Sequence, residues 1–127
     1  MDSEANAISE KVLVVEDDAD ATLLFKTALE RGGHEVRVAS TAREARSVAH
    51  QFEPSVVVID IGLPDMNGHQ LGRTLRAVPE LAHCRLIAVT GHTAQRMVAR
   101  SIAAGFEAHL TKPVSASSLL DAVSGSK

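Results

Sequence analysis

The chain has 127 residues and a mass of 13.5 kDa, which suits a single domain with a buried core. Its hydrophobic fraction of 45% and charged fraction of 23% are ordinary for a globular protein, and three Phe with no Trp or Tyr indicate an aliphatic core. A net charge of −3 argues against a nucleic-acid-binding domain, which would normally be strongly basic.

The cysteine content and the apolar runs bear on the compartment. A single cysteine, Cys84, cannot form an intramolecular disulfide, and it is expected to take a place in the core or at a strand edge. No apolar run is long enough to span a bilayer, and the start of the chain lacks the features of a signal peptide. We therefore expect a cytoplasmic protein with a flexible N-terminal arm over residues 1–9, a domain over 10–124 and a tail over 125–127.

Strand-like and helix-like patterns alternate five times along the chain. Short β-branched or alternating runs predict strands, and apolar residues at three- and four-residue spacing predict the helices between them. A capping box, Thr41 to Glu44, begins the second helix, and Pro79 closes the third. The predicted strands are 11–15, 35–39, 55–59, 86–90 and about 107–110, and the predicted helices cover about 21–31, 42–52, 68–78, 94–104 and 115–123.

This alternation predicts an α/β sandwich built on a parallel sheet. The first, third and fourth strands are apolar throughout, whereas 35–39 and 107–110 alternate in character, so these two are expected at the sheet edges. The expected fold is a doubly wound, five-stranded parallel sheet of flavodoxin-like order 2-1-3-4-5 with five helices. In such sheets the ligand crevice lies at the carboxyl ends of the first and third strands.

Acidic residues follow those two strands directly. Glu16 and Asp17 come after the first strand and Asp60 comes directly after the third, so their carboxylates should converge at one edge of the sheet. A group of anions needs a cation to hold it together, and oxygen ligands with no Cys/His pattern point to Mg²⁺ or a similar hard ion such as Mn²⁺. Any one acid alone would more often cap a helix, as we expect Asp18 to do.

The motifs at the strand ends match a known family when they are taken as an ordered set. They are Val14-Val15-Glu16-Asp17-Asp18, Asp60-Ile61-Gly62-Leu63-Pro64-Asp65-Met66-Asn67-Gly68, Thr90, and Lys112-Pro113. In this order and spacing they closely resemble the receiver domain of bacterial response regulators, over about residues 11–123. Each motif alone would be weak, but the complete set is specific.

The resemblance implies a role for each acid. Asp60 would be the phosphoacceptor, taking a phosphoryl group from a phosphohistidine to form an aspartyl phosphate. A divalent ion on Asp17, Asp60 and the backbone carbonyl of Gly62 would offset the repulsion between two anions, and Glu16 would act on the ion through water. The pair Glu16-Asp17 replaces the commoner pair of two Asp, a variant that should preserve cation binding.

The resemblance also implies roles around the phosphate. Lys112 would neutralise the phosphoryl oxygens, the Thr90 hydroxyl would donate to one of them, and the small Gly91 would leave space for the group. Gly68 is expected to permit a special turn at the start of the third helix. In the family, Pro113 commonly follows a cis peptide bond.

A second departure from the family lies in the fifth strand. His109 occupies its switch position, which is often Tyr or Phe, so the aromatic swing of the family is less expected here. His109 could still change rotamer with Thr90, and a half-exposed edge histidine is equally expected. His92 falls where receivers control water access to the phosphate, with a plain surface histidine equally expected. The remaining histidines are scattered without ligand spacing, and no chemistry is assigned to them: His34, His50, His69 and His83.

The predicted function is a phosphoacceptor in a two-component or phosphorelay system, a signalling protein and not an enzyme. Its partners would be a sensor histidine kinase or histidine phosphotransfer protein, and a downstream protein that docks on the face formed by the fourth helix, fifth strand and fifth helix. Neither nucleic acid nor membrane is expected. One alternative is a Mg²⁺-dependent phosphohydrolase, although Gly62 stands where it would need a second Asp. Another is a receiver fold acting as a constitutive interaction module.

Overall fold

The computed structural model describes residues 9–91 and 95–125. Most of the predicted arm and tail, together with His92 and Ala94, therefore lie outside the described residues. The strands are β1 (Lys11–Val15), β2 (Glu35–Ala39), β3 (Val56–Asp60), β4 (Arg85–Thr90) and β5 (Ala108–Thr111). The helices are α2 (Ala19–Arg31), α3 (Ala42–Phe52), α4 (Gly68–Arg76), the 3-10 turn η1 (Pro79–Leu81), α5 (Gln95–Ala103) and α6 (Ala116–Ser124). None of the helices in these two stretches has the length and apolar character that crossing a bilayer would take.

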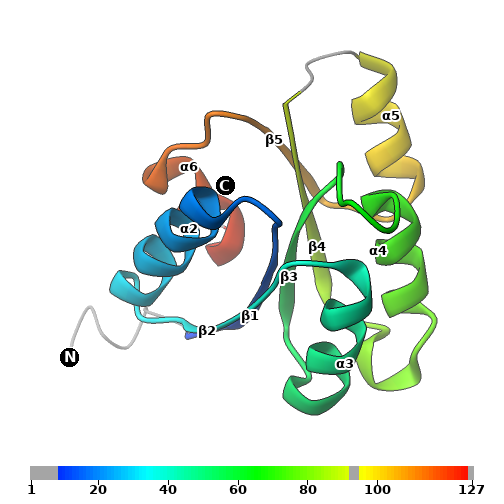
Figure 1. Cartoon of the computed structure of the whole chain (residues 1–127), viewed down its shortest axis with the longest axis horizontal. Helices are drawn as coiled ribbons and strands as arrows, with labels where there is room; N and C mark the ends of the chain where they lie inside the picture. Colours follow the sequence, from blue (N-terminus) through cyan, green and yellow to red (C-terminus); the bar gives the residue numbers. More distant parts are fainter. Residues whose placement is uncertain (1–8, 92–94, 126–127) are drawn as a thin grey trace.

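The five strands form one parallel sheet in the order β2-β1-β3-β4-β5. The predicted order and the two predicted edge strands are confirmed. Helices α2 and α6 cover one face of this sheet, and α3, α4 and α5 cover the other (Figure 1). The fold is thus the three-layer, doubly wound arrangement that the alternating pattern predicted.

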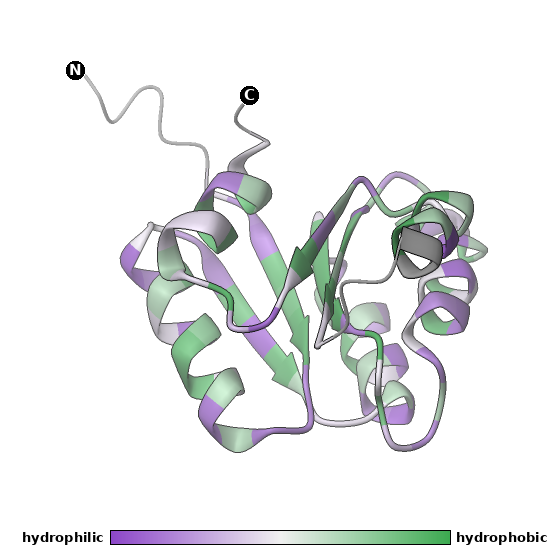
Figure 2. Ribbon diagram, turned by 90° about the horizontal axis from the view of Figure 1, so that it is seen from above, coloured by the Kyte–Doolittle hydropathy of each residue, from purple (hydrophilic) through white to green (hydrophobic). Residues whose placement is uncertain are grey.

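Alternation along each strand divides the core between the two faces. Leu13 and Val15 of β1 pack with the cluster beneath α3 and α4, whereas Val12 and Val14 pack toward α2 and α6. All four are essentially without solvent contact, which is why the central strands contain apolar residues on both faces. Figure 2 shows this hydrophobic colouring concentrated in the central strands and on the inner sides of the helices. Cys84 is buried in the first cluster, as expected.

The helices begin at side-chain caps. Asp18 caps α2 by accepting a hydrogen bond from the amide of Ala21, which confirms the predicted cap. Thr41 caps α3 in the same way, but the predicted capping box is wrong in its second half. The carboxylate of Glu44 accepts from the amide and hydroxyl of Ser40 and not from the amide of Thr41.

Several boundaries differ by one or two residues from the sequence prediction, and two of these differences have a clear physical reason. Helix α4 ends at Arg76, and Val78 precedes the separate turn η1 because the residue before a proline is disfavoured in the α region. Strand β5 begins one residue later than predicted, at Ala108, where its pairing with Ile87 of β4 starts. Neither difference moves the strand ends that concern function.

Candidate functional site

The sheet register brings the predicted residues to one edge. Val15 of β1 pairs with Ile59 of β3, so the next residues, Glu16 and Asp60, lie side by side. On the other side of β3, Asp60 pairs with Val89 of β4, and Thr90 is the next residue along β4. The amide of Lys112, just after β5, donates to the carbonyl of Thr90 at 2.8 Å. Parallel pairing therefore gathers residues that are up to 96 positions apart in the chain.

Glu16 is the most deeply buried of the acids, with only 2% of its surface exposed. One carboxylate oxygen, Oε2, accepts a hydrogen bond from the Asp18 amide at 3.1 Å. The other, Oε1, lies 3.1 Å from Nζ of Lys112, but the angles do not make this ion pair a hydrogen bond. Among the described residues, Oε1 therefore has ionic contact without a hydrogen-bond donor.

Asp60 is held from two sides. The Gly62 amide donates to Oδ1 at 3.0 Å, and Nζ of Lys112 donates to Oδ2 at 3.3 Å. The side chain is 11% exposed, so it is fixed in position while remaining accessible to a small reactant. Lys112 thus bridges Asp60 and Glu16 and partly offsets the charge of the two neighbouring carboxylates.

The electrostatic balance of this group is reflected in two shifted pKa values. Burial raises the pKa of Glu16 from 4.5 to about 7, with a further rise from nearby Asp60, while the Asp18 amide and Lys112 oppose the shift. For Lys112, burial acts to lower the pKa, but the contacts with Glu16 and Asp60 outweigh it and raise the value. The site therefore stabilises a positive charge among its carboxylates.

The three acids can supply ligands to one cation. One carboxylate oxygen from each of Glu16, Asp17 and Asp60 lies within 4.8 Å of the others, and Asp17 is exposed where the other two are buried. An oxygen-only set of this kind suits Mg²⁺. The buried Oε1 of Glu16, which receives no hydrogen bond from the described residues, is the kind of atom that a bound cation or its water would satisfy.

The remaining predicted residues surround this cluster. Thr90 is buried at the end of β4, and a Cβ atom added to the exposed Gly91 would meet none of the described residues within 4 Å, so among these residues open space adjoins the threonine. The Lys112–Pro113 peptide bond is cis, as the resemblance implied. Gly68 does not need an unusual turn, since its φ is not positive. It is required because a Cβ there would lie 2.7 Å from Cα of Ile61.

The position of His109 was predicted, but its partners were not. Its Nδ1 lies 3.0 Å from the hydroxyl of Ser101 on α5, and that hydroxyl lies 2.8 Å from Nε2 of His69 on α4. No chemistry was predicted for His69, and Ser101 was predicted only as a residue of the helix over about 94–104. A polar serine at an apolar position of the helical pattern was the available signal.

Comparison with known proteins agrees with this geometry. Residues 12–124 match the family model of the response regulator receiver domain. A 14.6 kDa protein of Leptolyngbya boryana is 35% identical over 103 residues, covering 81% of this chain and 79% of the relative. The polar-differentiation response regulator DivK of Brucella ovis is 28% identical over 116 residues, covering 91% and 94%.

The same likeness extends to three-dimensional structure. The chemotaxis response regulator CheY4 of Vibrio cholerae superposes with a TM-score of 0.86 at 25% identity, covering 91% of this chain and 97% of that one. Receiver domains are the phosphoacceptors of two-component signalling, and they generally bind Mg²⁺ at an acidic cluster such as the one described above. With a family match that spans nearly the whole chain, the protein belongs to the response regulator receiver domain family.

Proposed function

We propose that Asp60 accepts a phosphoryl group from a phosphohistidine and that the resulting aspartyl phosphate switches a partner-binding surface. The observation that carries this proposal is the position of the Asp60 carboxylate. It is held by the Gly62 amide and by Lys112 at an edge of the sheet where two further acids converge. A carboxylate that is fixed, accessible and paired with a lysine suits a nucleophile toward phosphorus.

A carboxylate oxygen of Asp60 forms a bond to phosphorus as the bond from phosphorus to the donor imidazole nitrogen breaks. That nitrogen keeps the electron pair and takes up a proton from solvent. The product is an acyl phosphate whose added negative charge lies next to Nζ of Lys112, which is already 3.3 Å from Asp60. The open space beside Gly91 would admit the phosphoryl oxygens near the Thr90 hydroxyl.

Glu16, Asp17, Asp60 and the backbone carbonyl of Gly62 would hold the Mg²⁺ or Mn²⁺ ion, with Glu16 acting through water. Bound there, the ion would neutralise charge on the phosphoryl oxygens during transfer. The buried carboxylate of Glu16 supports this assignment, because its pKa of about 7 reflects a negative charge that the protein alone does not fully compensate.

Receiver domains interact in general with histidine kinases and with downstream effectors. For this chain we propose a sensor kinase or histidine phosphotransfer protein as the donor, and an output partner that docks on the face of α5, β5 and α6. The phosphate would act by shifting a conformational equilibrium that already exists in the resting protein. The protein would promote only its own phosphorylation and dephosphorylation, and would turn over no external substrate.

Intact-mass spectrometry after incubation with a small acyl phosphate and Mg²⁺ tests the proposal. The wild-type protein should gain the mass of one phosphoryl group, and Asp60→Asn should gain none. Asp65→Asn is a matched control because Asp65 follows Asp60 on the same loop but hydrogen-bonds to the start of α3, and it should be labelled.

An unmodified wild-type protein, or an equally modified Asp60→Asn variant, would refute the assignment of Asp60. Sustained release of inorganic phosphate from a phosphate ester would instead favour the phosphohydrolase alternative. Partner binding that is unchanged by Asp60→Asn under phosphorylating conditions would favour a constitutive interaction module.

A further inference from the structure

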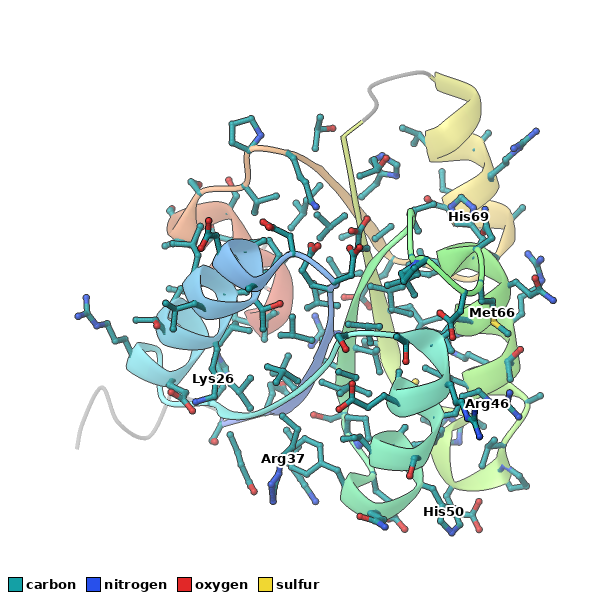
Figure 3. All side chains as sticks on the ribbon, in the orientation of Figure 1. Lys26, Arg37, Arg46, His50, Met66 and His69 are labelled. Carbon is teal, nitrogen blue, oxygen red and sulfur yellow. The ribbon has the colours of Figure 1, made fainter. Side chains whose placement is uncertain are left out.

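A hydrogen-bonded chain of three side chains connects the switch position to two helices. Its members are His69 in the first turn of α4, Ser101 in α5 and His109 in β5. Ser101 is 1% exposed and His69 is 5% exposed, so water does not compete freely for these contacts. Figure 3 labels His69 where α4 lies next to α5. The ring of Phe106 packs edge-on against it, with 5.7 Å between the ring centroids.

The imidazole of His109 is held at one end only. Its Nδ1 contacts the Ser101 hydroxyl, whereas its buried Nε2 has no hydrogen-bond partner among the described residues. A ring turned toward solvent would satisfy both nitrogens with water, so the observed position depends on the serine. The contact with Ser101 therefore fixes the side chain in this position, while the unsatisfied Nε2 favours its movement toward water.

The number of hydrogens in the chain limits how many protons it accepts. With both rings neutral, one ring donates to the Ser101 oxygen and the other accepts the hydroxyl hydrogen. One added proton leaves both hydrogen bonds possible. After a second proton, Nε2 of His69 and Nδ1 of His109 both carry hydrogen. The Ser101 hydroxyl then has no acceptor among these three side chains, and two positive charges flank its oxygen.

The surrounding charges act against the second proton. Arg73 on α4 and Arg100 on α5 face His69 together with His109 of β5, and no described carboxylate bonds to either imidazole. Burial, followed by these positive groups, lowers the pKa of His69. Because the pKa of His69 is lowered in the folded state, the folded protein loses stability as the pH falls below the ordinary histidine pKa of 6.5. Acid therefore opposes the resting arrangement.

We propose that Ser101 acts as a latch that holds His109 against α5 in the unphosphorylated protein, and that protons added to the hydrogen-bonded chain at acidic pH open this latch. Ser101 is a positioning residue, because it acts through His109 and does not touch the phosphoacceptor. The regulatory consequence rests on the proposed function. Opening the latch would move the switch-position side chain and bias the surface formed by α5 and β5, independently of the phosphate.

Nuclear magnetic resonance of the unphosphorylated protein tests the latch directly. The readouts are nuclear Overhauser effects between the His109 ring and the Cβ protons at position 101, and the nitrogen shifts of both imidazoles, at about pH 8 and about pH 5. The contact should be present in wild type at the higher pH and lost at the lower. It should be lost at both in Ser101→Ala, whereas Ser47→Ala, a change at an exposed helical serine, should behave as wild type.

A second variant separates charging from mere loss of packing. His69→Gln retains a group that can hydrogen-bond to Ser101 but does not titrate, so its His109 contact should persist at both pH values. The latch is overturned if Ser101→Ala keeps the contact at pH 8, if wild type keeps it when both rings are charged, or if His69→Gln loses it at low pH as wild type does. No phosphodonor is used, so failure of wild type to accept phosphate at Asp60 would refute the proposed function and leave this result standing.

Discussion

Replacing Glu16 by Gln should make the metal-free protein more stable at neutral to alkaline pH. The folded-state pKa of this buried carboxyl is about 7, against 4.5 for an ordinary glutamate. Between these values the folded state binds more protons than the unfolded state, so stability decreases as pH rises. The difference corresponds to about 3 kcal/mol above pH 7. Glutamine removes this penalty and can still accept the hydrogen bond from the Asp18 amide.

We expect Glu16→Gln to raise the free energy of unfolding by about 1–3 kcal/mol at about pH 8 and to change it little near pH 4.5, the lower figure allowing for an amide nitrogen that faces Lys112. Urea unfolding followed by circular dichroism, with a chelator present, measures this difference. Glu80→Gln, at an exposed carboxylate, is the control and should show no such change.

Added Mg²⁺ should then make wild type more stable than Glu16→Gln. An ion that binds the folded state stabilises it by mass action, and the wild-type site offers one more charged ligand than the variant. Wild type should therefore gain more stability from Mg²⁺ than Glu16→Gln. If the variant is no more stable than wild type at pH 8 without metal, the buried carboxylate of Glu16 is not an uncompensated charge and the reasoning fails.

Two further substitutions test the packing around the phosphoacceptor. Gly68→Ala should lower the free energy of unfolding by about 1–3 kcal/mol and reduce labelling of Asp60, because the added Cβ would meet backbone atoms of Ile61 and Asp60 at 2.7 and 2.8 Å. Gly91→Ala, whose Cβ would meet no described residue within 4 Å, is the control for stability and should leave the free energy of unfolding unchanged. Asp65→Ala should destabilise the protein at neutral pH, and this cost should shrink as the pH falls below 3.8, because hydrogen bonds from the α3 amides hold the pKa of this carboxyl below that ordinary value. Urea unfolding checks the stability of both variants, at neutral pH for Gly68→Ala and at neutral and acidic pH for Asp65→Ala, and intact mass checks the labelling of Asp60. Equal stability of Asp65→Ala and wild type at neutral pH would contradict the second prediction.

The fold was largely predictable because its signals are local. The central strand β3 is buried on both faces and is therefore apolar up to Asp60, whereas the edge strand β2 is partly exposed and alternates between polar and apolar residues. The boundary at Val78 was missed because an apolar residue at helical spacing does not reveal that the next proline has already ended the helix. The hydrogen bonds that Ser40 donates to the Glu44 carboxylate were missed because the geometry of a cap depends on the path of the preceding loop.

The site was predictable to the extent that it follows from strand ends. Glu16, Asp60, Thr90 and Lys112 each come directly after or at the end of a strand, and parallel pairing has no alternative but to bring such residues to one edge. What could not be predicted is how they divide their contacts. That Lys112 bridges two carboxylates, and that one oxygen of Glu16 receives no hydrogen bond from the described residues, depends on side-chain positions set by packing.

The sequence by itself determined the order of the strands, the identity of the acids at their ends and the family to which those motifs belong, because each of these follows from short-range pattern and spacing. Only the tertiary structure decided the chain from His69 through Ser101 to His109. Those residues lie on α4, α5 and β5, and nothing in their spacing marks them as partners. Their contact exists because α4 and α5 pack on the same face of the sheet beside its edge strand β5. This packing buries His69 and connects it to His109 through Ser101.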